Sequence, residues 1–375
     1  MDNLAQGELK NIISQYQWFK VEHLLEKKVI EAIRKRQKKI PGLRQDPLKY
    51  TAVWGEGILT PGCRECCLKG RWAQIRTTTK CNFSCKFCYY HGEKDIPERE
   101  LIPDDMYLLG DGKRGFTETE LQLVFQVQGK RFLNGVSWLY YEPLMKIEKI
   151  VPLMKRLHTQ GYHQWLYTNG VFATRENLQK LADAGLNEIR FNLAASNCSD
   201  TVIKNMEIAR KYFKYLCIES PMFTAYHDVF MKKRNAILNT GVTQINFAEL
   251  QIFQHTKQYF KNEGMLYRYS QGYVSPIKSR QLVYDFFDVA VREKWKNIVL
   301  HDCSNENKFF RGVHACSANV SFGFVDYSSS FKLETDFYVD ALKYLCRLDG
   351  GNEKSKRDLE RCWNKIQNEP SPSRD

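Results

Sequence analysis

Short β-rich runs alternate with longer amphipathic segments between about residues 72 and 250. Six runs are brief and rich in β-branched or aromatic residues, which is typical of strands. They cover residues 72–77, 136–141, 164–168, 188–193, 215–219 and 244–250. Between them, apolar residues recur at helical spacing, as over residues 147–160, and Thr117 with Glu120 forms a capping-box pattern at the start of another helix. The pattern predicts a repeated strand-helix unit.

Six such units without strand hairpins indicate an α/β fold, with a parallel sheet covered by helices. Active sites of these folds lie at the carboxyl ends of the strands. We expect residues 71–250 to form this core, after a helical N-terminal extension over residues 1–70. An α+β C-terminal extension over residues 251–367 has a helix near 281–293 and a strand near 297–302, and residues 368–375 form a polar, disordered tail.

Bulk composition agrees with an intracellular protein. The 375 residues fit one α/β barrel with extensions. Twelve cysteines occur without an apolar signal segment at the start, so we expect reduced thiols and a cytoplasmic location. No apolar run approaches the roughly 18 residues that span a bilayer, so we expect a soluble protein.

The net charge of +13 leaves a polyanionic partner such as RNA open. The densest basic run, residues 34–39, follows apolar residues at helical spacing, so it is also typical of a solvated last helical turn, where the helix dipole favours cations. No aromatic residue interleaves the run to stack bases. Nucleic-acid binding is therefore possible but not favoured.

Three cysteines follow the first expected strand at C-x3-C-x2-C spacing: Cys81, Cys85 and Cys88. A structural zinc ion takes four ligands, whereas a cubane iron-sulfur cluster held by three cysteines keeps one iron open for another ligand. His91 could complete a Cys3His zinc site, so the loop alone leaves zinc as an alternative.

The loop has an aromatic residue before its last cysteine and Tyr89 after it, and it resembles the cluster loop of the radical SAM superfamily. Glu142 and Pro143, after the second strand, are similar to the end of that superfamily's Gly-Gly-Glu-Pro motif. Tyr140 and Tyr141 stand where the motif has glycines, and such bulky residues disfavour a close backbone approach. After the third strand, residues 168–170 read Thr-Asn-Gly, as in many members of the superfamily.

The resemblance implies a partial (β/α)6, TIM-like barrel with a [4Fe-4S] cluster on Cys81, Cys85 and Cys88. S-adenosylmethionine (SAM) would complete the open iron through its amine and carboxylate, and its reductive cleavage would give a 5'-deoxyadenosyl radical that abstracts a substrate hydrogen. It also implies the SAM contacts: Glu142 for the amine, Thr168 and Asn169 as polar groups, Asn192 for the ribose or carboxylate, and Phe87 near the adenine.

Two carboxylates near later strand ends, Glu219 and Glu249, are candidate substrate contacts, although either could pair with a neighbouring Arg or Lys. Alternation along the fourth strand predicts that Arg190 and Asn192 point into the barrel, while Ile189 and Phe191 face the helices.

A second metal site is predicted from cysteines outside the core. Cys63 and Cys66 form a C-x2-C pair, with Cys67 as a neighbour, and Cys303 and Cys316 follow the expected C-terminal strand. Four such ligands could close an auxiliary iron-sulfur cluster or a zinc site. The remaining thiols lie among apolar or helical neighbours and are expected to pack in the interior: Cys198, Cys217, Cys346 and Cys362.

These features together predict a radical SAM enzyme that acts on a small metabolite or a peptide. Its electrons would come from an external donor such as flavodoxin or ferredoxin. The alternatives are an RNA-modifying radical SAM enzyme and a non-catalytic, metal-stabilised RNA-binding protein.

Overall fold

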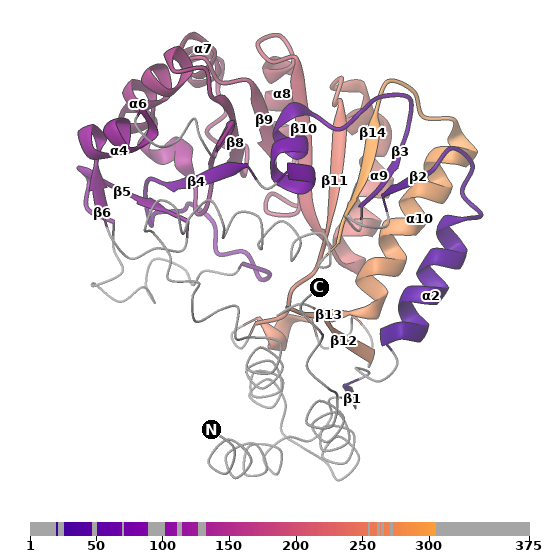
Figure 1. The fold of residues 1–375 in the computed structure, drawn as a ribbon. Coiled ribbons are helices and arrows are strands. Elements are labelled where there is room, and N and C mark those ends of the chain that lie inside the picture. Colours follow the sequence, from indigo (N-terminus) through magenta and orange to yellow (C-terminus); the bar gives the residue numbers. More distant parts are fainter. Residues whose placement is uncertain are drawn as a thin grey trace, which may run out of the picture.

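One large sheet organises the described part of the chain (Figure 1). The computed structural model describes residues 20–21, 26–46, 51–69, 71–88, 102–110, 115–126, 133–253, 256–260, 263, 266–270 and 273–304. Cys316, His91, the far C-terminal extension and the tail lie outside these residues. Within them, eleven strands pair in the order β2-β3-β14-β11-β10-β9-β8-β7-β4-β5-β6.

The centre of this sheet is parallel. All six predicted strands are present, and the predicted C-terminal strand joins them as β14. The parallel strands are β4 (Trp72–Arg76), β7 (Gly135–Trp138), β8 (His163–Thr168), β9 (Glu188–Phe191), β10 (Tyr215–Met222), β11 (Gln244–Glu249) and β14 (Val299–Cys303). The sheet is open, as expected for a partial barrel.

Antiparallel strands extend both edges. β5 (Met106–Leu109) pairs with β4 and with β6 (Gly115–Thr117), while β3 (Thr51–Trp54) pairs with β14 and with β2 (Arg44–Asp46). The N-terminal extension is therefore not purely helical, although it contains α2 (Glu26–Gln37). Nor does the sheet end at residue 250, because β14 pairs with β11.

Helices cover the outer face of the sheet (Figure 1). They are α4 (Glu118–Val124), α6 (Ile147–Thr159), α7 (Arg175–Asp183), α8 (Asp200–Ala209), α9 (Thr224–Asn239) and α10 (Ile277–Glu293). A 3-10 turn, η6 (Pro143–Lys146), leads into α6, and η7 (Lys257–Tyr259) follows β11. The capping box at Thr117 and Glu120 is present. No helix in these described ranges is both long and apolar enough to cross a membrane.

A smaller sheet combines β1 (Lys20–Val21), β12 (Leu266–Ser270) and β13 (Tyr273–Pro276). It joins the start of the described chain to the segment that follows the core.

The inner face of the large sheet is covered by α3 (Pro61–Cys63) and the π-helical turn η2 (Arg64–Lys69). The Thr60 amide donates to Gln244 Oε1 at 2.9 Å, and the Gly62 amide donates to Glu188 Oε1 at 2.5 Å. Both acceptors lie on the first residues of their strands. Residues 60–69 therefore close the inner face near the amino ends of the strands.

Side-chain alternation along β9 agrees with the sequence. Ile189 and Phe191 belong to the core shared with the helices, whereas Arg190 lies among side chains of the inner face. The two faces thus differ in chemistry along β9: its outward side chains are apolar, and the inner face carries charge and sulfur.

Candidate active site

The loop after β4 carries three partly exposed thiols, Cys81, Cys85 and Cys88, none of them in a disulfide. The Cys88 amide donates to the Cys85 carbonyl at 3.0 Å, which closes a turn between two of the sulfurs. Burial, with the nearby Cys88 and Cys81, raises the pKa of Cys85 to about 12. A bound metal cation would reverse this preference, since metal-coordinated thiols ionise, and three soft sulfur donors fit an iron-sulfur cluster.

Hydrogen bonds join this loop to the next two strand ends. The Glu142 amide donates to the Lys80 carbonyl at 3.1 Å, and Asn169 Nδ2 donates to Asn82 Oδ1 at 2.6 Å. The three motifs identified in the sequence are therefore in contact at the carboxyl end of the sheet, where α/β folds bind their ligands.

Glu142 holds two of these motifs together. Its Oε1 accepts from the Leu144 amide at 3.1 Å and from Thr168 Oγ1 at 2.8 Å, and its Oε2 accepts from the Asn169 amide at 2.8 Å. Its side chain is completely buried, which raises its pKa to about 7 against the opposing effect of these donors. The Glu142 carboxylate thus links the ends of β7 and β8 through hydrogen bonds. A direct contact with the SAM amine stays a prediction.

Tyr140 and Tyr141, which stand where the motif has glycines, adopt a backbone conformation that favours glycine. Their φ angles are 72° and 54°, in the left-handed region that glycine enters without a steric penalty. Tyr140 is held by a 2.8 Å hydrogen bond from its hydroxyl to Gln74 Oε1. The strand-end backbone is therefore turned as glycines would allow, despite two bulky side chains.

The Thr-Asn-Gly segment forms a tight turn after β8. Thr168 Oγ1 accepts from the Gly170 amide at 3.0 Å, and Asn169 Oδ1 accepts from the Val171 amide at 3.1 Å. Gly170 has a φ of 86°, and a Cβ there would lie 2.6 Å from Val202 and 2.7 Å from Phe191. Glycine is thus required by both conformation and space.

Asn192 and Phe87 lie near the same end of the sheet. Asn192 follows β9, and its Oδ1 accepts from the Ala195 amide and from Ser220 Oγ, both at 3.2 Å. Among the described residues its Nδ2 has no hydrogen-bond partner. Phe87 packs against Phe223, just after β10, with ring centroids 5.8 Å apart.

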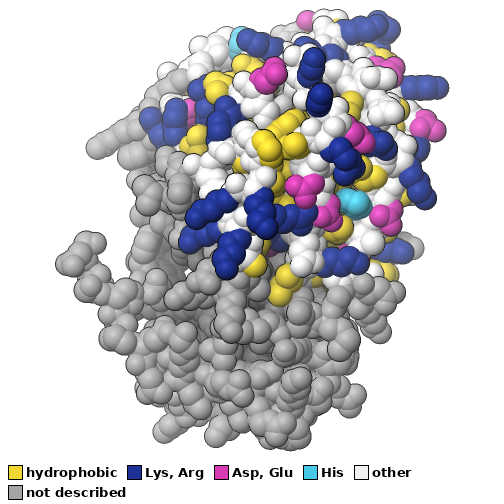
Figure 2. All heavy atoms as spheres, turned by 90° about the vertical axis from the view of Figure 1, so that its right-hand side faces the viewer, with side chains coloured by type: hydrophobic (Ala, Val, Ile, Leu, Met, Phe, Trp, Pro, Cys, Tyr) yellow, Lys and Arg dark blue, Asp and Glu magenta, His cyan; other side chains and the backbone are white. Residues whose placement is uncertain are grey.

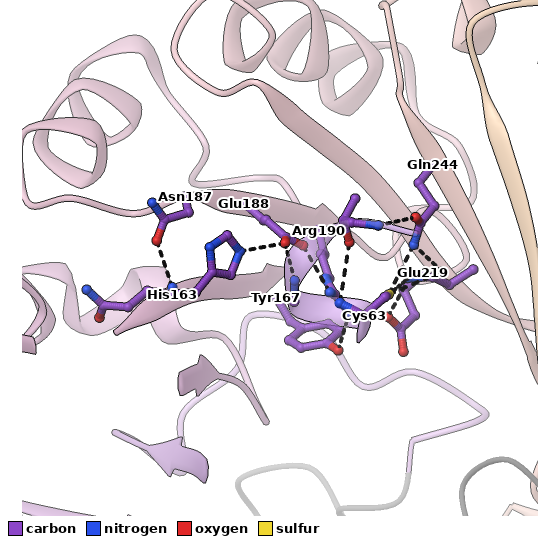
Figure 3. Close-up of polar contacts among 12 residues, drawn as sticks. Cys63, His163, Tyr167, Asn187, Glu188, Arg190, Glu219 and Gln244 are labelled. Carbon is purple, nitrogen blue, oxygen red and sulfur yellow. Dashed lines mark hydrogen bonds and ion pairs between the residues drawn. The ribbon is translucent and has the colours of Figure 1, made fainter. Parts of the chain in front are cut away.

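Glu219 lies inside β10, because this strand continues three residues beyond its predicted end (Figure 3). Its Oε2 accepts from Arg190 Nη1 and from Asn246 Nδ2, both at 3.1 Å. Arg190 also pairs with Glu188 at 3.0 Å and donates to Tyr167 Oη at 2.9 Å. The pairing alternative thus accounts for Glu219, and its predicted substrate contact has no support from this geometry.

The charges of this inner-face network stabilise one another. Burial opposes ionisation of Glu188, but Arg190 and His163 hold its pKa below the ordinary value. Burial likewise disfavours the Arg190 cation, but Cys63, Tyr167 and the carboxylates around it keep its pKa well above the ordinary value.

Glu249 faces the opposite side of the sheet. It shares a strand face with Phe247, which stacks on Phe286 of α10, and its Oε2 lies 3.8 Å from Arg280 Nη1. Its side chain is completely buried. Strand alternation therefore directs Glu249 away from the interior, and the geometry gives no support to a substrate contact.

A second group of thiols lies on the inner face and includes three of the four predicted residues, Cys63, Cys66 and Cys303. The sequence interpretation missed Cys67 and His301. Cys67 makes side-chain contacts with all three of the other sulfurs, and it forms a potential ligand set with His301 and Cys303, whose ligand atoms lie within 4.8 Å of one another. His301 could have been found from the sequence, because side chains alternate along a strand and residues 301 and 303 therefore share a face.

Lys149 of α6 is another residue that the sequence did not single out. Its Nζ donates to the Thr77 carbonyl at 2.8 Å, and also to the carbonyls of Pro103 and Met106. Burial lowers its pKa to about 8. It holds the start of the cysteine loop, but nothing distinguishes it in sequence from other lysines of an amphipathic helix.

Comparison with known sequences gives matches over part of the chain. A protein of Methanocaldococcus jannaschii described as a glycyl-radical enzyme activating enzyme is 27% identical over 161 residues, or 42% of this chain and 38% of that protein. A protein of Saccharolobus solfataricus described as a probable GTP 3',8-cyclase is 25% identical over 222 residues, or 56% of this chain and 66% of that protein. The chain spans less than two thirds of the length of either relative.

Solved structures give weaker likenesses. Streptococcus suis SuiB bound to its precursor peptide SuiA has a TM-score of 0.45 at 11% identity, over 77% of this chain and 64% of that one. Methylornithine synthase has a TM-score of 0.43 at 11% identity, over 82% of this chain and 80% of that one.

The family comparison covers the segment that carries the cysteine loop, Glu142 and the Thr-Asn-Gly turn. Residues 75–224 match the family model of the Radical SAM superfamily. Because this match and the strand-end motifs coincide, residues 75–224 form a radical SAM domain whose subfamily is not identified.

Proposed function

We propose that this enzyme reductively cleaves SAM at a [4Fe-4S] cluster held by Cys81, Cys85 and Cys88, and uses the resulting radical to abstract a substrate hydrogen. The observation that carries the proposal is the hydrogen-bonded contact of the cysteine loop with Glu142 and the Thr-Asn-Gly turn. The cluster and SAM would supply the redox chemistry, while the protein binds and orients them.

Each side chain then has a role that follows from its position. The three thiols hold the cluster and leave one coordination position for SAM. The turned backbone at Tyr140 and Tyr141 presents carbonyls that could accept from an ammonium group. Glu142 keeps this backbone and the Thr-Asn-Gly turn in register.

Two residues complete the proposed SAM pocket. Asn192 has an amide nitrogen without a partner among the described residues, which suits the ribose or the carboxylate. Phe87 offers an aromatic face for the adenine, beside Phe223.

The substrate in this proposal is a small metabolite or a peptide, and an external donor such as flavodoxin or ferredoxin supplies the electron. The two sequence relatives are described with different activities, activation of a glycyl-radical enzyme and cyclisation of GTP, so they support the superfamily chemistry without selecting one substrate. We also propose a cytoplasmic location, because metal-binding thiols must stay reduced.

RNA is less well supported as a partner. Arg36, within the basic run, pairs with Asp285 at 2.7 Å and Asp288 at 2.6 Å on α10. Figure 2 shows Lys and Arg side chains interspersed with Asp and Glu over the described part of one face, and these acidic groups weaken its attraction for a polyanion.

Cluster binding can be tested by spectroscopy. The anaerobically reconstituted chain should contain about four iron and four sulfide at the loop. The electron paramagnetic resonance signal of its reduced cluster should change when SAM is added. Cys85→Ala should remove this signal, whereas Cys198→Ala, which alters a buried thiol outside both cysteine groups, should retain it. A SAM-responsive signal that survives Cys85→Ala would overturn the assignment.

A further inference from the structure

A second group of potential metal ligands lies on the inner face of the sheet. Cys63, Cys67 and Cys303 are at most 2% exposed, and His301 is completely buried. The Cys67 thiol is in hydrogen-bond contact with the sulfurs of Cys63, Cys66 and Cys303. Soft donors have thus been brought together from two segments more than two hundred residues apart in the chain.

His301 is oriented as a metal-binding histidine would be. Its Nδ1 lies 3.0 Å from Asn246 Oδ1, an arrangement in which Nδ1 carries the proton and Nε2 carries the lone pair. Nε2 is buried and has no hydrogen-bond partner among the described residues. A buried nitrogen without a partner is costly, and a bound cation would remove that cost.

Polar groups around Cys63 match a thiolate better than a neutral thiol. Gln244 Nε2 donates to the Cys63 sulfur at 3.0 Å, and Figure 3 shows this contact beside Arg190. Arg190 contributes a buried positive charge close to Cys63, and its Nε has no hydrogen-bond partner in the described part of the chain. Donors and a balancing charge behind the ligands are typical of protein metal sites.

We propose that Cys63, Cys67, Cys303 and His301 bind a single zinc ion. Zinc-sulfur bonds of about 2.3 Å place the sulfurs of a tetrahedral site about 3.8 Å apart. Ligand atoms of Cys67, His301 and Cys303 lie within 4.8 Å of one another, which fits that size, and Cys63 joins the set through its contact with the Cys67 sulfur. A cubane cluster would have to fit four irons and four sulfides between thiols that already touch.

The burial of this site indicates a structural role. A catalytic zinc keeps one position for water or substrate, whereas four protein ligands close the coordination sphere. The ion would join the segment 61–69 to β14, the last parallel strand in the described part of the chain, and so hold this segment against the inner face. Metal binding would then contribute directly to folding.

The test separates this centre from the SAM cluster by metal analysis. In the full chain, Cys85→Ala should lose the iron of the loop and keep about one zinc per chain. Cys67→Ala should lose the zinc and keep about four iron. Cys198→Ala is the matched control and should keep both metals. The two proposals can therefore fail independently. The loop can prove not to bind iron while zinc is found, and zinc can be missing while the loop binds iron.

Cobalt gives a second readout that does not depend on the Cys67 variant folding. Cobalt(II) added to metal-depleted Cys85→Ala chain should give the intense absorption of tetrahedral thiolate coordination. Three results would overturn the proposal: a brown Cys85→Ala chain that retains about four iron, a folded Cys85→Ala chain without zinc, or octahedral cobalt without thiolate bands.

Discussion

Two tyrosines in a left-handed backbone conformation are the most informative residues of the proposed SAM pocket. Left-handed backbone costs an L-residue about 1–2 kcal/mol, and here two consecutive residues bear that cost. Strain of this kind persists where the surrounding structure over-determines it, often at functional sites. We infer that the fold fixes the direction of the backbone carbonyls at positions 140 and 141, whichever side chains these positions carry.

Replacing Tyr141 measures this strain. Tyr141→Gly should be more stable to urea than Tyr141→Ala by about 1 kcal/mol, because only glycine adopts a φ of 54° without a steric penalty. The comparison of two truncations cancels the lost ring. At the helical control Lys155, which lies on the exposed face of α6, the alanine variant should be the more stable one. The same order at both sites would contradict the reading of strain.

Glu142 should make stability depend on pH. Its pKa is raised from an ordinary 4.5 to about 7, so the folded chain binds more protons than the unfolded chain between these values. Stability relative to Glu142→Gln should therefore fall by about 2–3 kcal/mol as the pH rises from near 5 to near 8. Urea unfolding of both chains in one metallation state would measure it, and a pH-independent difference would argue against a buried, titrating carboxylate.

Arg190 balances two buried carboxylates, Glu188 and Glu219. Arg190→Gln should lower the free energy of unfolding by about 3–5 kcal/mol, because it leaves uncompensated charge inside the protein. The control Arg234→Gln breaks a more exposed pair with Glu293 and should cost about 1 kcal/mol or less. Equal losses in thermal or urea unfolding would contradict the proposed balance of charge.

For individual residues, sequence spacing was enough to group Cys81, Cys85 and Cys88 in one loop. The sequence could not predict the surroundings of Glu219 and Glu249. Those surroundings depend on where each strand ends and on which face of the sheet the side chain lies. Cys67 and His301 could be recognised as a potential ligand pair only from the structure, because the fold brings them together from distant parts of the sequence.

Among the elements, strands of the parallel core were predictable because each is a short apolar run bounded by turn residues. The end of β10 was not. The sequence predicted an end at residue 219, yet the strand continues through Pro221 to Met222. Its pairing with β9 stops at Ile218, so the missing amide hydrogen of Pro221 interrupts no bond to that neighbour.

β2 and β3 were missed for a different reason. They are three and four residues long and carry little pattern of their own. They exist as strands because β14 offers an edge for β3 to pair with. Short strands of this kind depend on tertiary context more than on propensity.

The capping box of α4 can be tested by mutation. Thr117→Ala should cost about 1 kcal/mol and speed hydrogen exchange in the first turn, because it removes the side chain that accepts from the Glu120 amide at 3.3 Å. Thr119→Ala, an exposed change within the same helix, is the control and should be neutral or slightly stabilising. No difference between the two would show that the cap does not contribute.

For the whole molecule, the sequence predicted a parallel α/β core with its chemistry at the carboxyl ends of the strands. It could not predict that residues 60–69 cover the inner face, since the contacts of Thr60 and Gly62 join segments more than a hundred residues apart. The resulting arrangement separates the proposed SAM cluster, at one end of the sheet, from the proposed zinc site on its inner face.

The proposed function requires the cysteine loop to support reductive cleavage of SAM. The most direct measurement is the formation of 5'-deoxyadenosine and methionine after anaerobic reconstitution, reduction and addition of SAM. We predict both products from the wild-type chain and from Cys198→Ala, and neither from Cys85→Ala. Absence of SAM cleavage in wild-type protein with verified iron and sulfide, or equal cleavage by Cys85→Ala, would contradict the proposed function.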